Sequence, residues 1–337
     1  MNSKPGLGVR AEKFISINKM LILFFAIGAA ASSPSFAAAY PERPIRLIVA
    51  YAPDTNADHT ARKLSTRISA ILGQQFVVDN RSGAGGIIGT ELASKSPADG
   101  YTLLFGTAQA MVTNVYLYRS LPYDPVKHFS PITRVGTHPH FIVVPLSVPV
   151  KSVAELIAYA KARPGQLNYA STGSGTNGHL SGALFGNMAA INIAHIPYNG
   201  AAQAITDLVS GRTQLMSYSY PPLAPMIRAG KLRVLATTGE KRSDIFPELP
   251  TVMEAGVPGF VITGWEGVFA PAGAPREIIM KIQGAVAETL KDPDLIADIK
   301  SDGGEPALNT PDAFAAFIRS ELVRYRKIVE ISGAKVE

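Results

Sequence analysis

Short apolar runs alternate with amphipathic stretches along the chain from residue 45 onward. The apolar runs are rich in β-branched residues and bounded by turn residues, which predicts strands. Capping residue types followed by helical spacing predict helices between them. The first predicted strands are residues 45–50, 76–78 and 101–105, and the first predicted helices run from 54–58 to Ile71 and over 87–95. Strand, loop and helix at this interval indicate a parallel α/β sheet with helices on both faces.

The same pattern restarts near Phe141. The second set of predicted strands is 141–144, 167–170, 193–196, 214–217 and 232–236, with helices at 152–162, 179–190 and 201–210. Residues 275–331 then carry apolar residues at helical spacing, a tail too long for the second set alone. We therefore predict two α/β domains, a discontinuous first domain of residues 40–140 and 265–337 and a second domain of residues 141–264. Two crossings between them form a hinge, and a ligand cleft is expected at the carboxyl ends of the strands.

Residues 1–39 have the organisation of a secretory signal peptide. Four basic residues precede the apolar run MLILFFAIGAAA, and small residues follow up to Ala39. We expect cleavage near Ala37 or Ala39 and a periplasmic location. The alternative is a membrane anchor, which is disfavoured because about 12 apolar residues at about 1.5 Å each are shorter than a hydrocarbon core about 30 Å thick.

Removal of this segment changes the charge balance. The whole chain has 32 Lys+Arg against 26 Asp+Glu, a formal net charge of +6. Residues 1–37 hold four of those basic residues and one acidic residue, so 28 remain against 25, a net charge of +3. No basic run or aromatic-interleaved basic stripe remains, and no nucleic-acid partner is therefore expected. The absence of Cys excludes a disulfide scaffold, and 47% hydrophobic residues supply material for two cores.

Residues 173–178 read GSGTNG between a predicted strand and a predicted helix, a literal G-x-G-x-x-G. A dinucleotide fingerprint also needs an acidic residue about 20 positions later, and residues 192–199 contain none. No cofactor is therefore assigned. Glycines and hydroxyl residues at a helix N-terminus instead favour an anion, and residues 54–58 offer a second such start. The alternative is that both stretches only cap helices.

No side-chain pattern indicates a catalytic or metal site. We find no P-loop, no G-x-S-x-G elbow and no H-E-x-x-H pair. His138 and His140 flank Pro139, and we interpret them as ordinary loop residues rather than metal ligands. His179 is placed either to hydrogen-bond an anion or to pack at a helix start. Trp265 lies at the predicted return crossing, where it walls the cleft or fills the hinge core.

Ordered motifs along the whole chain resemble a known family. They are NRSGAGG at 80–86, DGYTLL at 99–104, LPYDP at 121–125, LNYAS at 167–171, IPY at 196–198 and APAG at 270–273. On these motifs the chain resembles the Bug family, the periplasmic substrate-binding proteins associated with tripartite tricarboxylate transporters. The resemblance implies a type II periplasmic-binding-protein fold that closes on a small carboxylate ligand and delivers it to the membrane permease subunits of the transporter.

The resemblance also implies a set of ligand-binding residues, in which two loops typically hold one carboxylate. Carried over by position, the first loop contributes Ala52, Asp54, Thr55, Asn56 and Asp58, and the second contributes Ser171, Gly173, Ser174, Gly175 and Thr176. The rest of the predicted cleft is Thr107, Ala108, Gln109, His179, Tyr198, Tyr218, Ser219 and Trp265.

Two departures from the family pattern bear on the ligand. Asp54 adds negative charge where an anion is expected, so it points away or the ligand is oriented differently. Residues 217–221 read SYSYP, without the acidic residue that contacts ammonium groups, which argues against amino acids. The aromatic residues expected nearby are Phe105, Tyr198, Tyr218, Tyr220 and Trp265. They favour an aromatic mono- or dicarboxylate, with aliphatic di- and tricarboxylates as the alternative.

Two other classes of function stay open. The first is a soluble carboxylate sensor that presents its closed form to a membrane receptor. The second is an enzyme that acts on a small carboxylate through a cleft acid such as Asp58 or Glu266, although the sequence shows no base and nucleophile pair. For the binding protein we expect a monomer.

Overall fold

The computed structural model describes residues 1–3, 40–53 and 55–335. The expected signal peptide, with its cleavage site, and Asp54 lie outside the described residues. Pro41–Glu337 forms one compact unit. Among the helices described, none combines the length and apolar character that crossing a membrane requires.

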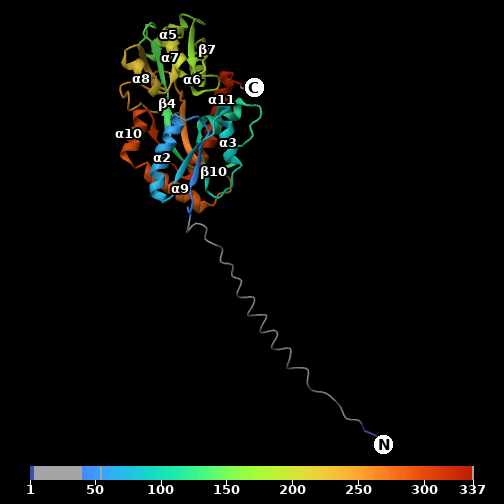
Figure 1. The fold of residues 1–337 in the computed structure, drawn as a ribbon. Helices are drawn as coiled ribbons and strands as arrows, with labels where there is room; N and C mark the ends of the chain where they lie inside the picture. Colours follow the sequence, from blue (N-terminus) through green and yellow to red (C-terminus); the bar gives the residue numbers. More distant parts are fainter. Residues whose placement is uncertain (4–39, 54, 336–337) are drawn as a thin grey trace. The chain divides into compact units, whose positions relative to one another are not determined.

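Two sheets organise this unit (Figure 1). The strands are β1 Ile45–Val49, β2 Phe76–Asn80, β3 Thr102–Thr107, β4 Phe129–Pro139, β5 Phe141–Pro145, β6 Leu167–Ser171, β7 Ile193–Pro197, β8 Leu215–Tyr218, β9 Leu232–Thr237, β10 Thr263–Pro271 and β11 Glu305–Pro306. Within the described residues, one sheet has the order β11-β4-β10-β3-β1-β2 and the other β7-β6-β8-β5-β9.

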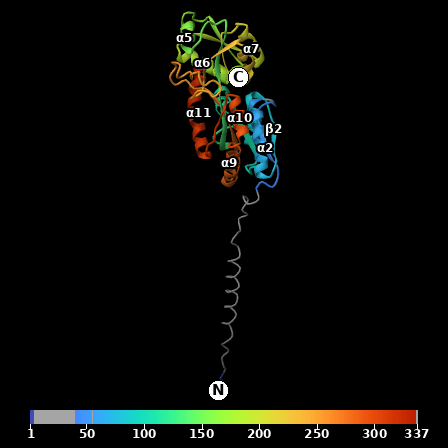
Figure 2. The same cartoon turned by 90° about the vertical axis from the view of Figure 1, so that its left-hand side faces the viewer.

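Helices cover both sheets. They are α2 Asn56–Leu72, α3 Ile87–Ser94, α4 Asn114–Leu117, α5 Val153–Lys161, α6 Asn177–Met188, α7 Ala201–Val209, α8 Tyr220–Arg228, α9 Arg276–Thr289, α10 Pro293–Ser301 and α11 Pro311–Ser332, with short η1 Ala84–Gly86 and η2 Gln109–Thr113. Helices α2 and α3 pack on the six-stranded sheet, and α6 and α7 pack on the five-stranded sheet. Figure 2 shows α5, α6 and α7 together at one end of this unit and α2 and α9 at the other.

Both sheets are mixed rather than parallel. Strand β1 pairs in parallel with β2 and β3, as the sequence predicts, and β6 pairs in parallel with β7 and β8. Strand β10 runs antiparallel to β3 and β4, and β5 runs antiparallel to β8 and β9. The purely parallel expectation is therefore wrong for these strands, because the chain turns back on itself where it passes between the sheets.

The chain passes between the sheets at two places. Strand β4 ends at Pro139 in the six-stranded sheet, and β5 begins at Phe141 in the five-stranded sheet. The chain returns between Thr237, where β9 ends, and Thr263, where β10 begins. The sequence predicts the crossings between the two domains near Phe141 and near Trp265. The boundaries of the two predicted domains stay a prediction.

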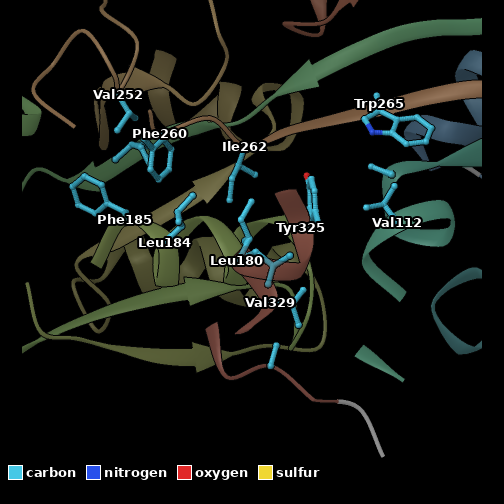
Figure 3. Packing of buried hydrophobic residues seen from close by; sticks show 14 of the residues in the cluster. Val112, Leu180, Leu184, Phe185, Val252, Phe260, Ile262, Trp265, Tyr325 and Val329 are labelled. Atoms are coloured by element: carbon cyan, nitrogen blue, oxygen red, sulfur yellow. The ribbon is translucent and has the colours of Figure 1, made fainter. Parts of the chain in front are cut away.

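One hydrophobic cluster extends from the first sheet to the second. Figure 3 shows part of it, in which Leu180 and Leu184 of α6 lie beside Tyr325 and Val329 of α11. The ring of Phe185 meets Phe260 edge to face at 6.2 Å. Because α11 comes from the C-terminal tail, the amphipathic pattern of that tail is explained by its packing against α6 and β4.

Local capping agrees with the sequence pattern. The Ser152 hydroxyl accepts a hydrogen bond from the Glu155 backbone N–H at 3.1 Å, so the predicted start of α5 is confirmed. Helix α6 begins at Asn177, two residues before the predicted start at His179, and the side chain of its N-cap residue Thr176 makes no capping bond. The free N–H groups at this start therefore stay available to a ligand.

Candidate functional site

A cavity of about 440 Å³ lies where several strands end and helices begin. Its described lining residues are Tyr51, Thr55, Asn56, Ala57, Thr107, Ala108, Gln109, His138, His140, Asn177, Tyr218, Ser219, Pro222, Gly264, Trp265 and Glu266. They come from both sheets and from the β4–β5 crossing. The cavity therefore has the position expected for a ligand site in open α/β sheets.

Part of the predicted site lines this cavity. The predicted residues on its wall are Thr55, Asn56, Thr107, Ala108, Gln109, Tyr218, Ser219 and Trp265. The described predicted residues that are not on its wall are Ala52, Asp58, Ser171, Gly173, Ser174, Gly175, Thr176, His179 and Tyr198. The second predicted loop is thus represented on the wall by the residue that follows it, Asn177.

The first loop is held by its own hydrogen bonds. Thr55 caps α2 by accepting from the Asp58 N–H at 3.4 Å, and its hydroxyl donates to the Ala52 carbonyl at 2.9 Å. The Asp58 carboxylate is 1% exposed and accepts from Arg62 at 2.9 Å and from the Asn80 amide at 2.9 Å. Asp58 is therefore a buried structural carboxylate rather than a cleft acid.

Tyr51 joins the first loop to the end of β3. Its hydroxyl lies 2.7 Å from the Thr107 hydroxyl, and the Ala110 backbone N–H donates to that same Thr107 oxygen at 3.4 Å. Burial raises the pKa of Tyr51 well above its usual value, so the phenol keeps its proton at neutral pH. The pair places one hydroxyl from each loop on the cavity wall.

Two hydroxyl groups of the second loop, those of Ser171 and Thr176, bond to the loop itself. Ser171 is fully buried, and its hydroxyl lies 2.6 Å from His195 Nε2 and donates to the Gly173 carbonyl at 3.0 Å. The Thr176 hydroxyl donates to the same carbonyl at 2.8 Å. Gly175 has φ +78°, a region that favours glycine, and a Cβ there would lie 2.4 Å from Leu117. These side chains therefore shape the loop, and its backbone presents the start of α6.

Two stacked imidazoles, those of His179 and His195, contact this loop through hydrogen bonds. The rings of His179 and His195 lie 3.8 Å apart and nearly parallel, and the Tyr169 ring stacks on His195 at 4.9 Å. The Gly175 N–H donates to His179 Nδ1 at 3.0 Å, so that nitrogen carries no proton. Burial lowers the pKa of both histidines, and with the neighbouring His179 it brings His195 to about 4. Both rings are therefore neutral at pH 7.

This stack predicts a loss of stability in acid. The folded-state pKa of His195 is below the ordinary value of 6.5. Between these two pKa values the unfolded chain binds a proton at this residue and the folded chain does not. The free energy of unfolding should fall as the pH drops from about 6.5 to about 4. His195→Gln, which can still hydrogen-bond Ser171, should weaken that pH dependence in urea unfolding at pH 7 and pH 5. An unchanged decline in the variant would contradict the role given to the stack.

His138, His140 and Glu266 also line the cavity. Of these, the sequence interpretation places only Glu266 in a cleft, as a candidate acid of the enzyme alternative. His138 Nε2 lies 3.2 Å from Glu266 Oε2, and Glu266 is 5% exposed. Burial opposes the charging of His138, but the Glu266 carboxylate outweighs it and raises the His138 pKa. Burial lowers the pKa of His140 to about 4, so that ring is neutral at pH 7.

The interpretation of His138 and His140 as ordinary loop residues missed their position. His138 is in β4 and His140 lies between β4 and β5, so their i, i+2 spacing places both on one face of an extended chain. That spacing was the feature of the sequence from which their shared position on the cavity wall could have been predicted. Among the described residues, no group of three or more His, Cys, Asp or Glu side chains is arranged to hold a metal ion.

The ring of Trp265 points away from the cavity. Trp265 is 2% exposed, its Nε1–H donates to Glu321 at 3.3 Å, and its ring meets Phe314 and Phe317 edge to face at 5.6 Å. It therefore fills the core on the α11 side of the crossing strands, one of the two roles left open by the sequence.

A second cavity of about 370 Å³ lies on that α11 side. Thr137 and Thr263 line it, whereas their strand neighbours His138 and Gly264 line the first cavity. Two of its charged groups have partners within the fold, since Arg324 pairs with Glu321 at 2.7 Å and Arg134 donates to Asn309 at 2.7 Å. The first cavity is therefore the better candidate for a ligand site.

Comparison with known proteins identifies similar chains. Residues 60–334 match the family described as tripartite tricarboxylate transporter family receptor. Protein BugT of Bordetella pertussis is 36% identical over 318 residues, which cover 94% of this chain and 98% of that protein.

Two solved structures are also similar to this chain. An R. palustris protein solved with adipate is 37% identical, with a TM-score of 0.77 over 88% of this chain and 100% of that one. The periplasmic binding protein BugD is 31% identical, with a TM-score of 0.74 over 88% of this chain and 100% of that one. The expected periplasmic-binding-protein fold is confirmed by these similarities.

Proposed function

This chain belongs to the tripartite tricarboxylate transporter receptor family, the Bug proteins, and from that membership we propose that it binds a small carboxylate in the 440 Å³ cavity and delivers it to a membrane permease. Its work is binding and closure rather than catalysis. The N-terminal segment is cleaved near Ala37 or Ala39, and the protein acts in the periplasm as a monomer.

One observation carries the proposal: three helices of eight or more residues begin at the same cavity. They are α2, α6 and α8, whose first residues or N-caps Asn56, Asn177 and Ser219 line the wall. Helix starts present backbone N–H donors and the positive end of the helix dipole, both of which favour a carboxylate. At the start of α6 no N-cap side chain takes up those donors. Helix α8 also lacks a side-chain cap, but Pro221 and Pro222 in its first turn carry no N–H, so α6 is the main donor. Among the described lining residues there is no Lys or Arg, so positive potential comes from the helix starts and from protonated His138.

The cleft between two lobes makes this a closing site. We propose that residues 40–140 with 265–337 form one lobe and residues 141–264 the other. The cavity wall takes Asn56 and Thr107 from the first lobe, and Asn177 and Ser219 from the second. A ligand favours the closed form only if it binds that form more tightly, as contacts from both lobes allow.

The aromatic content of the wall bears on the class of carboxylate. Of the rings expected near the ligand, Phe105 is fully buried, and Tyr198 donates to Asp207 at 3.0 Å outside the cavity. The Tyr218 ring lines the cavity beside the neutral His140 ring at 5.8 Å. These two rings support an aromatic carboxylate, and the adipate bound to the R. palustris relative supports an aliphatic one.

Calorimetric titration of the exported protein with terephthalate, phthalate, adipate and citrate tests the proposal. We expect at least one of these acids to bind with a micromolar or tighter dissociation constant and to be recovered without chemical change. Tight binding of aliphatic acids alone would remove the aromatic version. Absence of binding both by this panel and by monocarboxylic acids of similar size, or turnover of a bound acid, would contradict the proposal itself.

A further inference from the structure

The Glu266–His138 pair is the charged feature of the described cavity wall. Glu266 lies in β10 opposite Thr107 of β3, and His138 lies in β4 opposite Gly264. Nε2 of the histidine and Oε2 of the glutamate are 3.2 Å apart. Among the described residues, this is the only hydrogen bond seen to the Glu266 carboxylate, so its second oxygen is left to accept a donor from within the cavity.

Neighbouring carboxylates favour the protonated form of His138. The raised pKa of His138 favours the imidazolium, which offsets the Glu266 carboxylate, and Asp302 adds to the same effect. His140, the other histidine on the wall, is neutral at pH 7. The pair therefore offers an acceptor and a donor in contact, and the imidazole offsets part of the charge of the carboxylate.

A second ionised carboxylate on the ligand would bind unfavourably beside this pair. It would lie close to the Glu266 oxygen that His138 does not contact, where like charges repel. His138 is already occupied by Glu266, and the described wall has no Lys or Arg to compensate. A hydroxyl or primary amide, by contrast, can donate to Glu266 without bringing charge.

We propose that the Glu266–His138 pair selects ligands that carry one ionised carboxylate and, at the other end, a neutral hydroxyl or primary amide. This inference rests on the proposed function, because the helix starts must hold the carboxylate. Glu266 is then a specificity-determining residue that touches the ligand, and His138 positions and neutralises it.

The test compares unbranched acids of equal length, four to eight carbons, that differ only in the terminal group. Each length is titrated as the ω-hydroxy acid, the α,ω-diacid and the ω-amino acid. At the best length, the hydroxy acid should bind wild-type protein at least tenfold more tightly than the diacid or the amino acid. A diacid that binds equally well or better overturns the inference. So does a preferred amino acid, since the pair would then act as an anion.

Glu266→Gln tests whether the pair, rather than the rest of the site, sets the preference between acids. The amide removes the negative charge and can donate to a second carboxylate, so the diacid should gain at least tenfold and the hydroxy acid should lose its advantage. An unchanged ratio overturns the inference. If this variant does not fold, His138→Gln is measured in its place. It removes the imidazole beside Glu266, so the preference should shift towards the amino acid by about tenfold. An unshifted preference overturns the inference.

The outcomes for the two proposals are distinguishable. If no acid of this series binds but phthalate, terephthalate or citrate does, the inference fails and the carboxylate-binding function stands. If no acid of either panel binds, both fail.

Discussion

Asn177→Asp should weaken carboxylate binding by roughly a hundredfold while leaving the protein folded. Asn177 lies on the cavity wall at the first position of α6. A new carboxylate there faces the anion that the helix start is proposed to hold, and a loss of about 2.7 kcal/mol, less than the full repulsion of two charges about 4 Å apart, is a hundredfold. The same charge near a helix N-terminus stabilises the helix by about 0.3–1 kcal/mol. Binding and stability should therefore change in opposite directions.

Asn187→Asp is the matched control for this variant. Asn187 is exposed in the last turn of the same helix, so the change in charge is identical but lies far from the cavity. Calorimetry with the tightest-binding acid of the panel and urea unfolding are measured for both variants. Equal affinity in the wild-type protein and the Asn177 variant would remove the start of α6 from the site.

Trp265→Ala should lower the free energy of unfolding by about 3–5 kcal/mol, the usual cost of emptying a buried aromatic site. The Trp265 ring is 2% exposed and packs against Phe314, Phe317 and Phe269. Its loss opens a space between β10 and α11 and removes the N–H donor of Glu321. Because this is the sole tryptophan, unfolding of the variant must be followed by circular dichroism rather than by intrinsic fluorescence.

Trp265→Phe separates packing from the hydrogen bond. Phenylalanine retains most of the apolar contact but cannot donate to Glu321, which keeps its ion pair with Arg324. We expect a loss of about 1–3 kcal/mol, closer to that of an unmade buried hydrogen bond. A loss below about 1 kcal/mol in the alanine variant would contradict the placement of this ring in the core.

The regular βαβ segments of the fold could be predicted from sequence because their local patterns and tertiary roles agree. The runs at β1 and β3 are mostly apolar and mostly buried, as parallel strands require. Strands β4 and β10 could not be predicted in this way. Residues 129–139 contain two prolines and a glycine, and residues 263–271 contain two glycines and Glu266. Their pairing with each other, across more than a hundred residues of sequence, makes them strands.

In the candidate site, too, some residues could be predicted from sequence and others could not. Thr107 ends β3, Thr55 and Ser219 lie in loops that follow strands, and all three were expected on the wall from the family resemblance. Ser171 and Thr176 have the same residue types, but their hydroxyls satisfy the loop itself. Which way a short hydroxyl turns depends on local hydrogen bonds that the sequence does not specify.

The most informative residues of the site were hidden by distance in the sequence. His138 and Glu266 are 128 residues apart and meet because β4 and β10 are neighbours in one sheet. Neither residue is unusual alone. Their pairing, and the neutral state of the nearby His140, follow from strand register and burial, which become visible only in the folded chain.

A structure of the exported protein with the tightest-binding carboxylate tests the central claim most directly. The account predicts that the carboxylate oxygens lie within hydrogen-bonding distance of backbone N–H groups at the start of α6, with Thr107 and Ser219 on the same ligand. A ligand held instead in the cavity on the α11 side, between Arg134 and Arg324, would contradict it.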